Sequence, residues 1–116
     1  MNLAQIDMQQ LRIKHLLFKS KVRSVLYGGN FDEIFFSNAG PVNIWFNTIG
    51  LTKYGTLPEI VQLNKLHNEL LTAALQLFAL YNSGKIDSAH EGLKTIEAYS
   101  DKFQELIKIL EARLQE

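Results

Sequence analysis

The residues of this sequence best suited to metal or acid–base chemistry are its three histidines, His15, His67 and His90. Neutral imidazole is a good zinc ligand, and its pKa lies close to physiological pH. His15 and His67 each lie on an apolar stripe near the middle of a predicted long helix, whereas His90 lies just beside such a stripe and is expected to be exposed. In an antiparallel helix pair, His15 and His67 would lie at similar heights and be able to meet.

Two interpretations of this histidine pair remain open. Two facing imidazoles would supply two ligands of a metal site, but a stable zinc site normally has three or four protein ligands. The residues three and four positions after His67 are Leu70 and Leu71, which supply no further ligand. The other interpretation is that both histidines are buried core residues that hydrogen-bond to their neighbours, because buried polar groups usually find partners.

The remaining polar residues show no arrangement typical of an enzyme. The sequence has no cysteine, no glycine-rich phosphate loop and no His-Glu-x-x-His motif. Carboxylate metal centres in helical bundles use Glu-x-x-His pairs on core faces, but Glu91 directly follows His90. We therefore predict that the protein is not an enzyme and has no catalytic residues.

Three long amphipathic helices are predicted to position the histidines. The first runs from residue 3 to about residue 27, behind an N-cap at Asn2, and carries the first histidine. The central helix, over 58–83, carries the second histidine, begins with a proline in its first turn and ends at Gly84 in a left-handed cap. The last helix is predicted over about 86–114, with an apolar stripe that alternates in steps of three and four.

Shorter segments lie between the first two long helices. Short helices are predicted over 31–36 and 41–49, and a loop over 51–57. Trp45 is predicted to anchor the core, since an aromatic side chain of this size buries a large apolar area. The pattern predicts an all-α protein, an antiparallel four-helix bundle with three long helices and one short helix.

Size and composition indicate a single domain over residues 1–116. The sequence is 47% hydrophobic, which is enough for a proper core, and its twelve basic and twelve acidic residues cancel. A net charge of zero argues against binding to nucleic acid. The start of the chain lacks the pattern of a signal peptide, and the uncharged stretch 34–52 holds too many polar and helix-breaking residues to cross a membrane. We therefore expect a soluble, cytoplasmic protein.

The first helix carries a second apolar stripe that a simple bundle does not require. Leu3, Ile6, Ile13 and Leu17 lie on a different face from the stripe that includes His15. Large exposed apolar patches are unusual on monomers, so this stripe should be covered. Either the segment 34–52 folds over it within one protomer, or a second copy or another protein binds there.

Landmark residues follow one another along the chain in an order that is informative as a whole. They are His15, the segment Gly-Pro-Val-Asn-Ile-Trp at 40–45, Gly50, Tyr54, Pro58, His67 in a Leu-x-x-x-His pattern, Gly84 and Ser100. Over about residues 12–110 this order and spacing resemble the chemoreceptor zinc-binding (CZB) domains. These domains are cytoplasmic sensor modules of bacterial chemoreceptors and diguanylate cyclases.

The resemblance implies a four-helix bundle with one short helix and a zinc site built from three histidines and one cysteine. His15 and His67 match two of these ligands. Gly40 stands where the family has its cysteine, and Leu71 stands where it has its last histidine, so neither position can bind zinc through a side chain. The resemblance thus implies a degenerate site, with no cofactor or with zinc bound weakly at His15 and His67.

Two functions follow from these observations. The first is a sensory or regulatory bundle for bacterial signal transduction, without an output domain in this chain, that acts by forming a homodimer or by binding a signalling protein. The alternative is a zinc sensor in which His15 and His67 recruit ligands that the family does not use. Both functions are compatible with a cytoplasmic protein that binds neither nucleic acid nor membrane.

Overall fold

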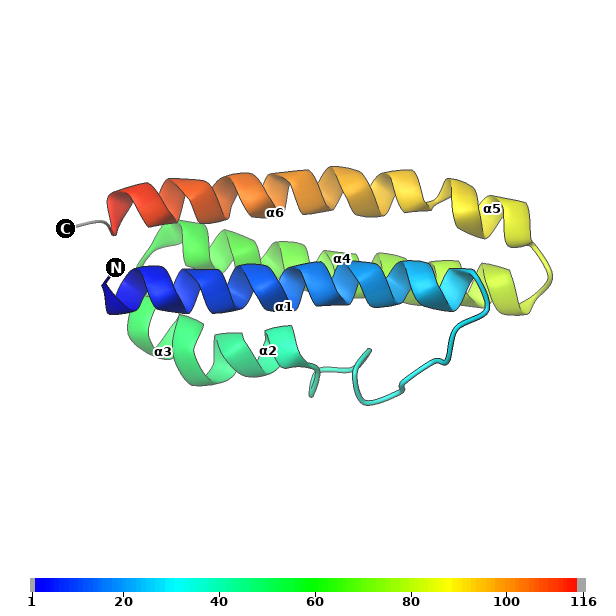
Figure 1. The fold of residues 1–116 in the computed structure, drawn as a ribbon, viewed down its shortest axis with the longest axis horizontal. Coiled ribbons are helices and arrows are strands. Elements are labelled where there is room, and N and C mark those ends of the chain that lie inside the picture. Colours follow the sequence, from blue (N-terminus) through cyan, green and yellow to red (C-terminus); the bar gives the residue numbers. More distant parts are fainter. Residues whose placement is uncertain (1, 115–116) are drawn as a thin grey trace.

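The computed structural model describes residues 2–114, and these form an all-helical fold with no strand among them. Three long helices, α1 (Leu3–Leu26), α4 (Pro58–Asn82) and α6 (Leu93–Arg113), lie side by side along the length of the molecule (Figure 1). The shorter α2 (Pro41–Trp45) and α3 (Leu51–Tyr54) cover one side of the molecule along the N-terminal half of α1. The predicted all-α class and the three long helices are confirmed.

Helix α1 begins and ends close to where the sequence indicates. Asn2 is its N-cap: the Asn2 side chain accepts a hydrogen bond from the Gln5 amide at 2.8 Å, and the Gln5 side chain reaches back to the Asn2 amide. The Asn2 side chain also donates to the carbonyl of Leu114 at 3.0 Å. At the far end, His90 contacts the carbonyl of Leu26. The last third of the chain therefore runs antiparallel to α1.

Helix α4 confirms the central helix predicted from the sequence. Pro58 occupies its first turn, where the missing amide hydrogen costs nothing. Gly84 follows its last turn with φ of 86°, a left-handed conformation that glycine adopts without strain. These two residues therefore mark the start and the end of α4 as the sequence predicts.

The last predicted helix is divided in two, which corrects the single helix expected over 86–114. Helix α5 spans Ile86–Glu91, and α6 begins at Leu93 after a break at Gly92. A Cβ atom at Gly92 would lie 2.2 Å from a methyl group of Leu77, so a larger residue there would displace the Leu77 side chain of α4. The spacing of apolar residues continues through the break and gives no sign of it.

The segment between α1 and α4 also differs from the prediction. Residues 31–36 form turns rather than a helix. The next helical stretch is longer than expected: α2 (Pro41–Trp45) continues into the π-helical turn η1 (Phe46–Gly50) and then α3 (Leu51–Tyr54), so the loop expected at 51–57 is half helical. A Cβ atom at Gly50 would lie 2.5 Å from the Trp45 ring, so the indole packs directly on this backbone.

The core contains several aromatic side chains, including Trp45 and its neighbour Phe46. Trp45 and Phe46 are both 1% exposed, which confirms Trp45 as a core anchor. The Phe36 ring contacts Phe18 and Phe78 edge to face, at 5.7 and 4.8 Å between centroids. This cluster joins α1, the turns before α2, and α4.

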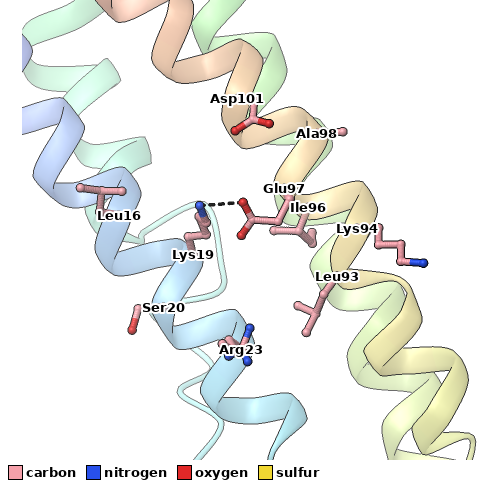
Figure 2. Close-up of a pocket in the computed structure, with 10 residues that line it drawn as sticks. All are labelled: Leu16, Lys19, Ser20, Arg23, Leu93, Lys94, Ile96, Glu97, Ala98 and Asp101. Carbon is pink, nitrogen blue, oxygen red and sulfur yellow. Dashed lines mark ion pairs between the residues drawn. The ribbon is translucent and has the colours of Figure 1, made fainter.

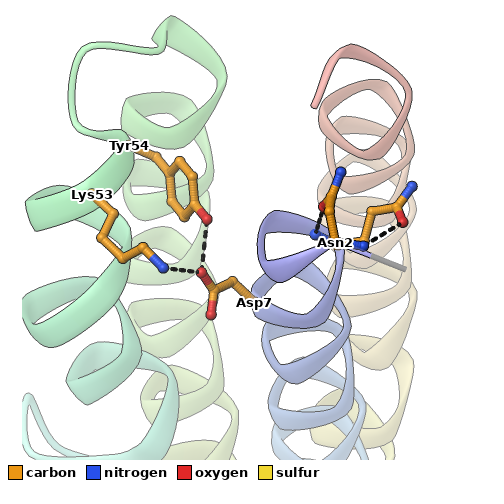
Figure 3. A network of polar contacts seen from close by, with 5 residues as sticks. Asn2, Asp7, Lys53 and Tyr54 are labelled. Atoms are coloured by element: carbon orange, nitrogen blue, oxygen red, sulfur yellow. Dashed lines mark hydrogen bonds and ion pairs between the residues drawn. The ribbon is translucent and has the colours of Figure 1, made fainter. Parts of the chain in front are cut away.

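A polar contact fixes α3 against α1. The buried carboxylate of Asp7 on α1 accepts hydrogen bonds from Lys53 Nζ at 2.6 Å and from the Tyr54 hydroxyl at 2.7 Å (Figure 3). The same contact raises the pKa of Lys53. A buried carboxylate is costly unless it is paired in this way.

Among the described helices, none is long and apolar enough to cross a membrane.

Candidate functional site

His15 and His67 both lie in the core, at 0% and 2% exposure. His15 comes from α1 and His67 from α4. His15 Nε2 lies 2.7 Å from the hydroxyl of Ser100 on α6, and His67 Nε2 lies 3.0 Å from Asn43 Oδ1 on α2. Ser100 and Asn43 are themselves buried, at 0% and 8% exposure. Four buried polar side chains from four helices therefore form two hydrogen-bonded pairs.

The contacts of Asn43 define the proton position on His67. The Asn43 amide nitrogen donates to Asn68 Oδ1 at 3.4 Å, which leaves Asn43 Oδ1 as the atom that faces the imidazole. Because that oxygen only accepts, His67 Nε2 carries the hydrogen and His67 Nδ1 carries a lone pair. This Nδ1 atom is buried and has no hydrogen-bond partner within residues 2–114.

His15 is held by stacking as well as by its hydrogen bond. Its ring lies parallel to Phe103 with 4.2 Å between centroids. Ser100 Oγ also accepts a hydrogen bond from Gln104 Nε2 at 3.3 Å, so its own hydrogen is free to point at His15 Nε2. As for His67, the Nδ1 atom of His15 is buried and has no partner in the described part of the chain.

Burial keeps both imidazoles neutral at physiological pH. Desolvation, together with a smaller repulsion from Lys19, lowers the pKa of His15 to about 4. Desolvation and the charge of a protonated His15 lower the pKa of His67 to about 3. Neutral imidazoles can ligate a metal, but they are equally suited to a hydrogen-bonded core.

The two remaining positions implied by the resemblance supply no ligand atom. Gly40 has no side chain, and a Cβ atom there would lie 2.3 Å from the Phe35 carbonyl oxygen. Leu71 is an apolar core residue at 7% exposure. Within residues 2–114, no group of three or more histidine, cysteine, aspartate or glutamate side chains could hold a metal ion. These residues do not fit the four-ligand zinc site of chemoreceptor zinc-binding domains.

Sequence reasoning found three of the four members of this cluster and missed the fourth. His15 and His67 came from the stripes, and Ser100 came from the resemblance. Asn43 was not singled out, although it is the one polar residue among apolar neighbours in α2. His90 is half-buried rather than exposed as expected, because its ring stacks on Tyr27 at 4.1 Å and its Nε2 contacts the Leu26 carbonyl.

A surface groove lies apart from these two histidine pairs. This groove of about 620 Å³ runs between α1 and α6. Across this groove, Lys19 Nζ forms an ion pair with Glu97 at 2.9 Å. Arg23 and Leu93 lie further along the same groove (Figure 2). Its charged side chains are of both signs and are open to solvent, which gives no preference for a ligand of one charge.

The second stripe of α1 faces outward and is exposed. Leu3 and Ile13 are 63% and 66% exposed, and Ile6 and Leu17 are 40% and 44% exposed. The idea that segment 34–52 covers this stripe is therefore wrong. That segment instead buries Trp45 and Phe46 in the core.

Comparisons with protein-family models, with curated proteins and with solved structures give no match. The resemblance to chemoreceptor zinc-binding domains therefore depends on the order and spacing of the residues quoted above.

Proposed function

We propose that this chain is a regulatory helical module, an antiparallel four-helix bundle with one short member, that transmits its signal by associating through the outward face of α1. In this proposal the chain acts like the cytoplasmic signalling modules of bacteria that it resembles. The observation that carries the proposal is the exposure of Leu3, Ile6, Ile13 and Leu17 on one face of one helix. His15, on the same helix, instead faces the closed core and is hydrogen-bonded.

The surroundings of His15 and His67 support an interaction module rather than a metal sensor, because they supply too few zinc ligands. Gly40 and Leu71 cannot ligate zinc, and both imidazole Nε2 atoms already have partners at 2.7 and 3.0 Å. A sensor that had kept its metal would need a third strong ligand near these rings. The site is better explained as a core that retains two hydrogen-bonded histidines, with the interaction surface on the opposite side of α1.

A photo-crosslinking amino acid at position 13 tests the proposal in the cells that make the protein. We expect a covalent adduct, identified by mass spectrometry as the chain itself or as a signalling protein. The matched control carries the same crosslinker at Glu105, an exposed position on α6, and should give none. Absence of an adduct at position 13, or equal adducts at both positions, would overturn the proposal.

A second candidate function is a zinc sensor built on His15 and His67, and one observation favours it. The Nδ1 atoms of both rings are buried and have no hydrogen-bond partner in the described residues. A lone pair on His67 Nδ1 is the form that binds a metal. In this function the imidazoles would bind zinc with water or with a ligand from a partner chain.

Metal content separates the two functions. Protein purified without chelator or histidine tag should contain far less than one zinc per chain if the core is only hydrogen-bonded. One zinc per chain or per dimer, lost in a His15→Gln/His67→Gln variant, would favour the zinc sensor. Glutamine keeps a hydrogen-bonding side chain at each position, so the variant separates loss of ligation from loss of packing.

A further inference from the structure

The outward face of α1 has a regular repeat that extends beyond its four apolar residues. Seven exposed positions follow one another in alternating steps of three and four residues. They are Leu3, Ile6, Gln10, Ile13, Leu17, Ser20 and Ser24. We call these positions the outward stripe. Such spacing matches the seam of a left-handed helix pair, in which another helix packs nearly parallel to α1.

No member of the outward stripe is charged, although α1 has several charged residues. Apart from Lys14, the charged side chains of α1 make contacts within the molecule. Lys19 pairs with Glu97, Arg12 pairs with Glu111, and Lys21 lies over the Phe35 ring. A seam that itself carries no charge suits a helix with a similar seam rather than a strongly charged ligand.

The apolar residues of the outward stripe are arranged nearly symmetrically about Gln10. Leu3 and Leu17 each lie seven residues from it, and Ile6 and Ile13 lie four and three residues away. If two α1 helices pack antiparallel with their Gln10 residues opposite each other, leucine meets leucine and isoleucine meets isoleucine. The two glutamine side chains can then hydrogen-bond across the axis, and a single polar residue in such a seam fixes its register.

Charge favours the antiparallel direction over the parallel one. Four of the five basic residues of α1 lie towards its C-terminal end, from Lys14 to Arg23, and its one acidic residue, Asp7, is engaged by Lys53 and Tyr54. Parallel helices would bring the two basic halves together. Antiparallel helices that overlap at residues 3–17 place these halves at opposite ends of the pair, where their repulsion is weakest.

From these observations we infer that the occupant of the outward stripe is a second copy of this chain, bound antiparallel with Gln10 near the two-fold axis. This inference depends on the proposed function, because it names the partner of the face on which that function acts. The contact is isologous, since the same residues serve both copies. The overlap spans only roughly 21 Å of helix at ~1.5 Å per residue, so the dimer should form in a concentration-dependent way.

Engineered cysteines test the partner and the direction together, because the natural sequence has no cysteine. A mixture of Leu3→Cys and Leu17→Cys proteins, one of them tagged to separate the products, is treated with a short bismaleimide. We expect mixed dimers at least several-fold in excess over dimers of either variant alone. Gln10→Cys should crosslink to itself, whereas Glu105→Cys on α6 should not.

Each other outcome overturns the inference in a distinct way. Efficient crosslinking of Leu3→Cys to itself and of Leu17→Cys to itself would mean a parallel pair. No crosslink at any stripe position, with monomeric protein at high concentration, would exclude a second copy as the occupant. The proposed function survives that last result if the photo-crosslinker at position 13 still captures an identified signalling protein, so the two failures can be told apart.

Discussion

The inner and outward faces of α1 carry side chains of similar size in opposite surroundings. On the inner face Leu11 and His15 are fully buried, whereas on the outward face Ile13 and Leu17 are 66% and 44% exposed. The inner face binds α2, α4 and α6 of the same chain. Within the described residues, the outward face touches nothing comparable. Helix α1 thus packs into the core on one side and, in our proposal, binds another molecule on the other.

The largest expected effect concerns the inner face and appears on acidification. An unfolded histidine has a pKa near 6.5, whereas burial lowers the pKa of His15 to about 4 and of His67 to about 3. Between pH 6.5 and these values the unfolded state binds more protons, so the free energy of unfolding falls as pH falls. At pH 5 the loss should be about 2 kcal/mol for each histidine and about 4 kcal/mol for both.

Chemical denaturation at pH 7.5 and pH 5 measures this loss. A His67→Gln variant is the matched control, because glutamine can still donate to Asn43 but does not titrate in this range. It should lose about half of the pH dependence, while changes from carboxylates remain the same in both proteins. An identical pH dependence in the variant would mean that His67 is not buried in its neutral form.

Truncation of one aliphatic side chain on each face of α1 compares the faces directly. Leu11→Ala, at 0% exposure, should lower the free energy of unfolding by about 3 kcal/mol, since it removes buried contacts and leaves a cavity. Ile13→Ala, two residues away, should change it by less than about 0.5 kcal/mol in dilute protein, where association is negligible. Comparable losses from both variants would show that the outward stripe is covered within one chain.

The contact between α1 and α3 should give a smaller change. Tyr54→Phe removes one of the two hydrogen bonds that the Asp7 carboxylate accepts, at 2.7 Å, and leaves the one from Lys53. A hydrogen bond to a charged group contributes about 1.5 to 3 kcal/mol net, and we expect a loss near the lower value because Lys53 still pairs with the carboxylate. Thermal unfolding measures it, and an unchanged midpoint would show that this bond does not hold α3 in place.

The sequence predicts those parts of the structure in which local periodicity decides the outcome. The stripes of α1 and α4, the Asn2 cap and the glycine at position 84 all follow from residues close together in the chain. The break at Gly92 does not, and this glycine lies against Leu77 of α4, a residue distant in the chain. Nothing in the spacing of the last helix records that contact.

The hydrogen-bond partners of the histidines depend on contacts between distant residues. His67 and Asn43 are 24 residues apart, and His15 and Ser100 are 85 residues apart. Stripes show that both histidines face the core but not which side chain each one meets. Similarly, the second stripe of α1 is visible in the sequence, whereas its exposure depends on the direction taken by the segment 34–52. Only the structure shows that this segment packs elsewhere.

The molar mass of the protein in solution, measured by light scattering over a range of concentrations, tests the contrast between the two faces most directly. We predict that the wild-type mass rises from that of one chain, 13.2 kDa, towards twice that value. Ile13→Asp should keep the protein monomeric at every concentration, whereas His15→Gln should leave the rise in mass unchanged. A mass that never rises, or a dimer that persists in Ile13→Asp, would contradict the assignment of the outward stripe as the surface of self-association.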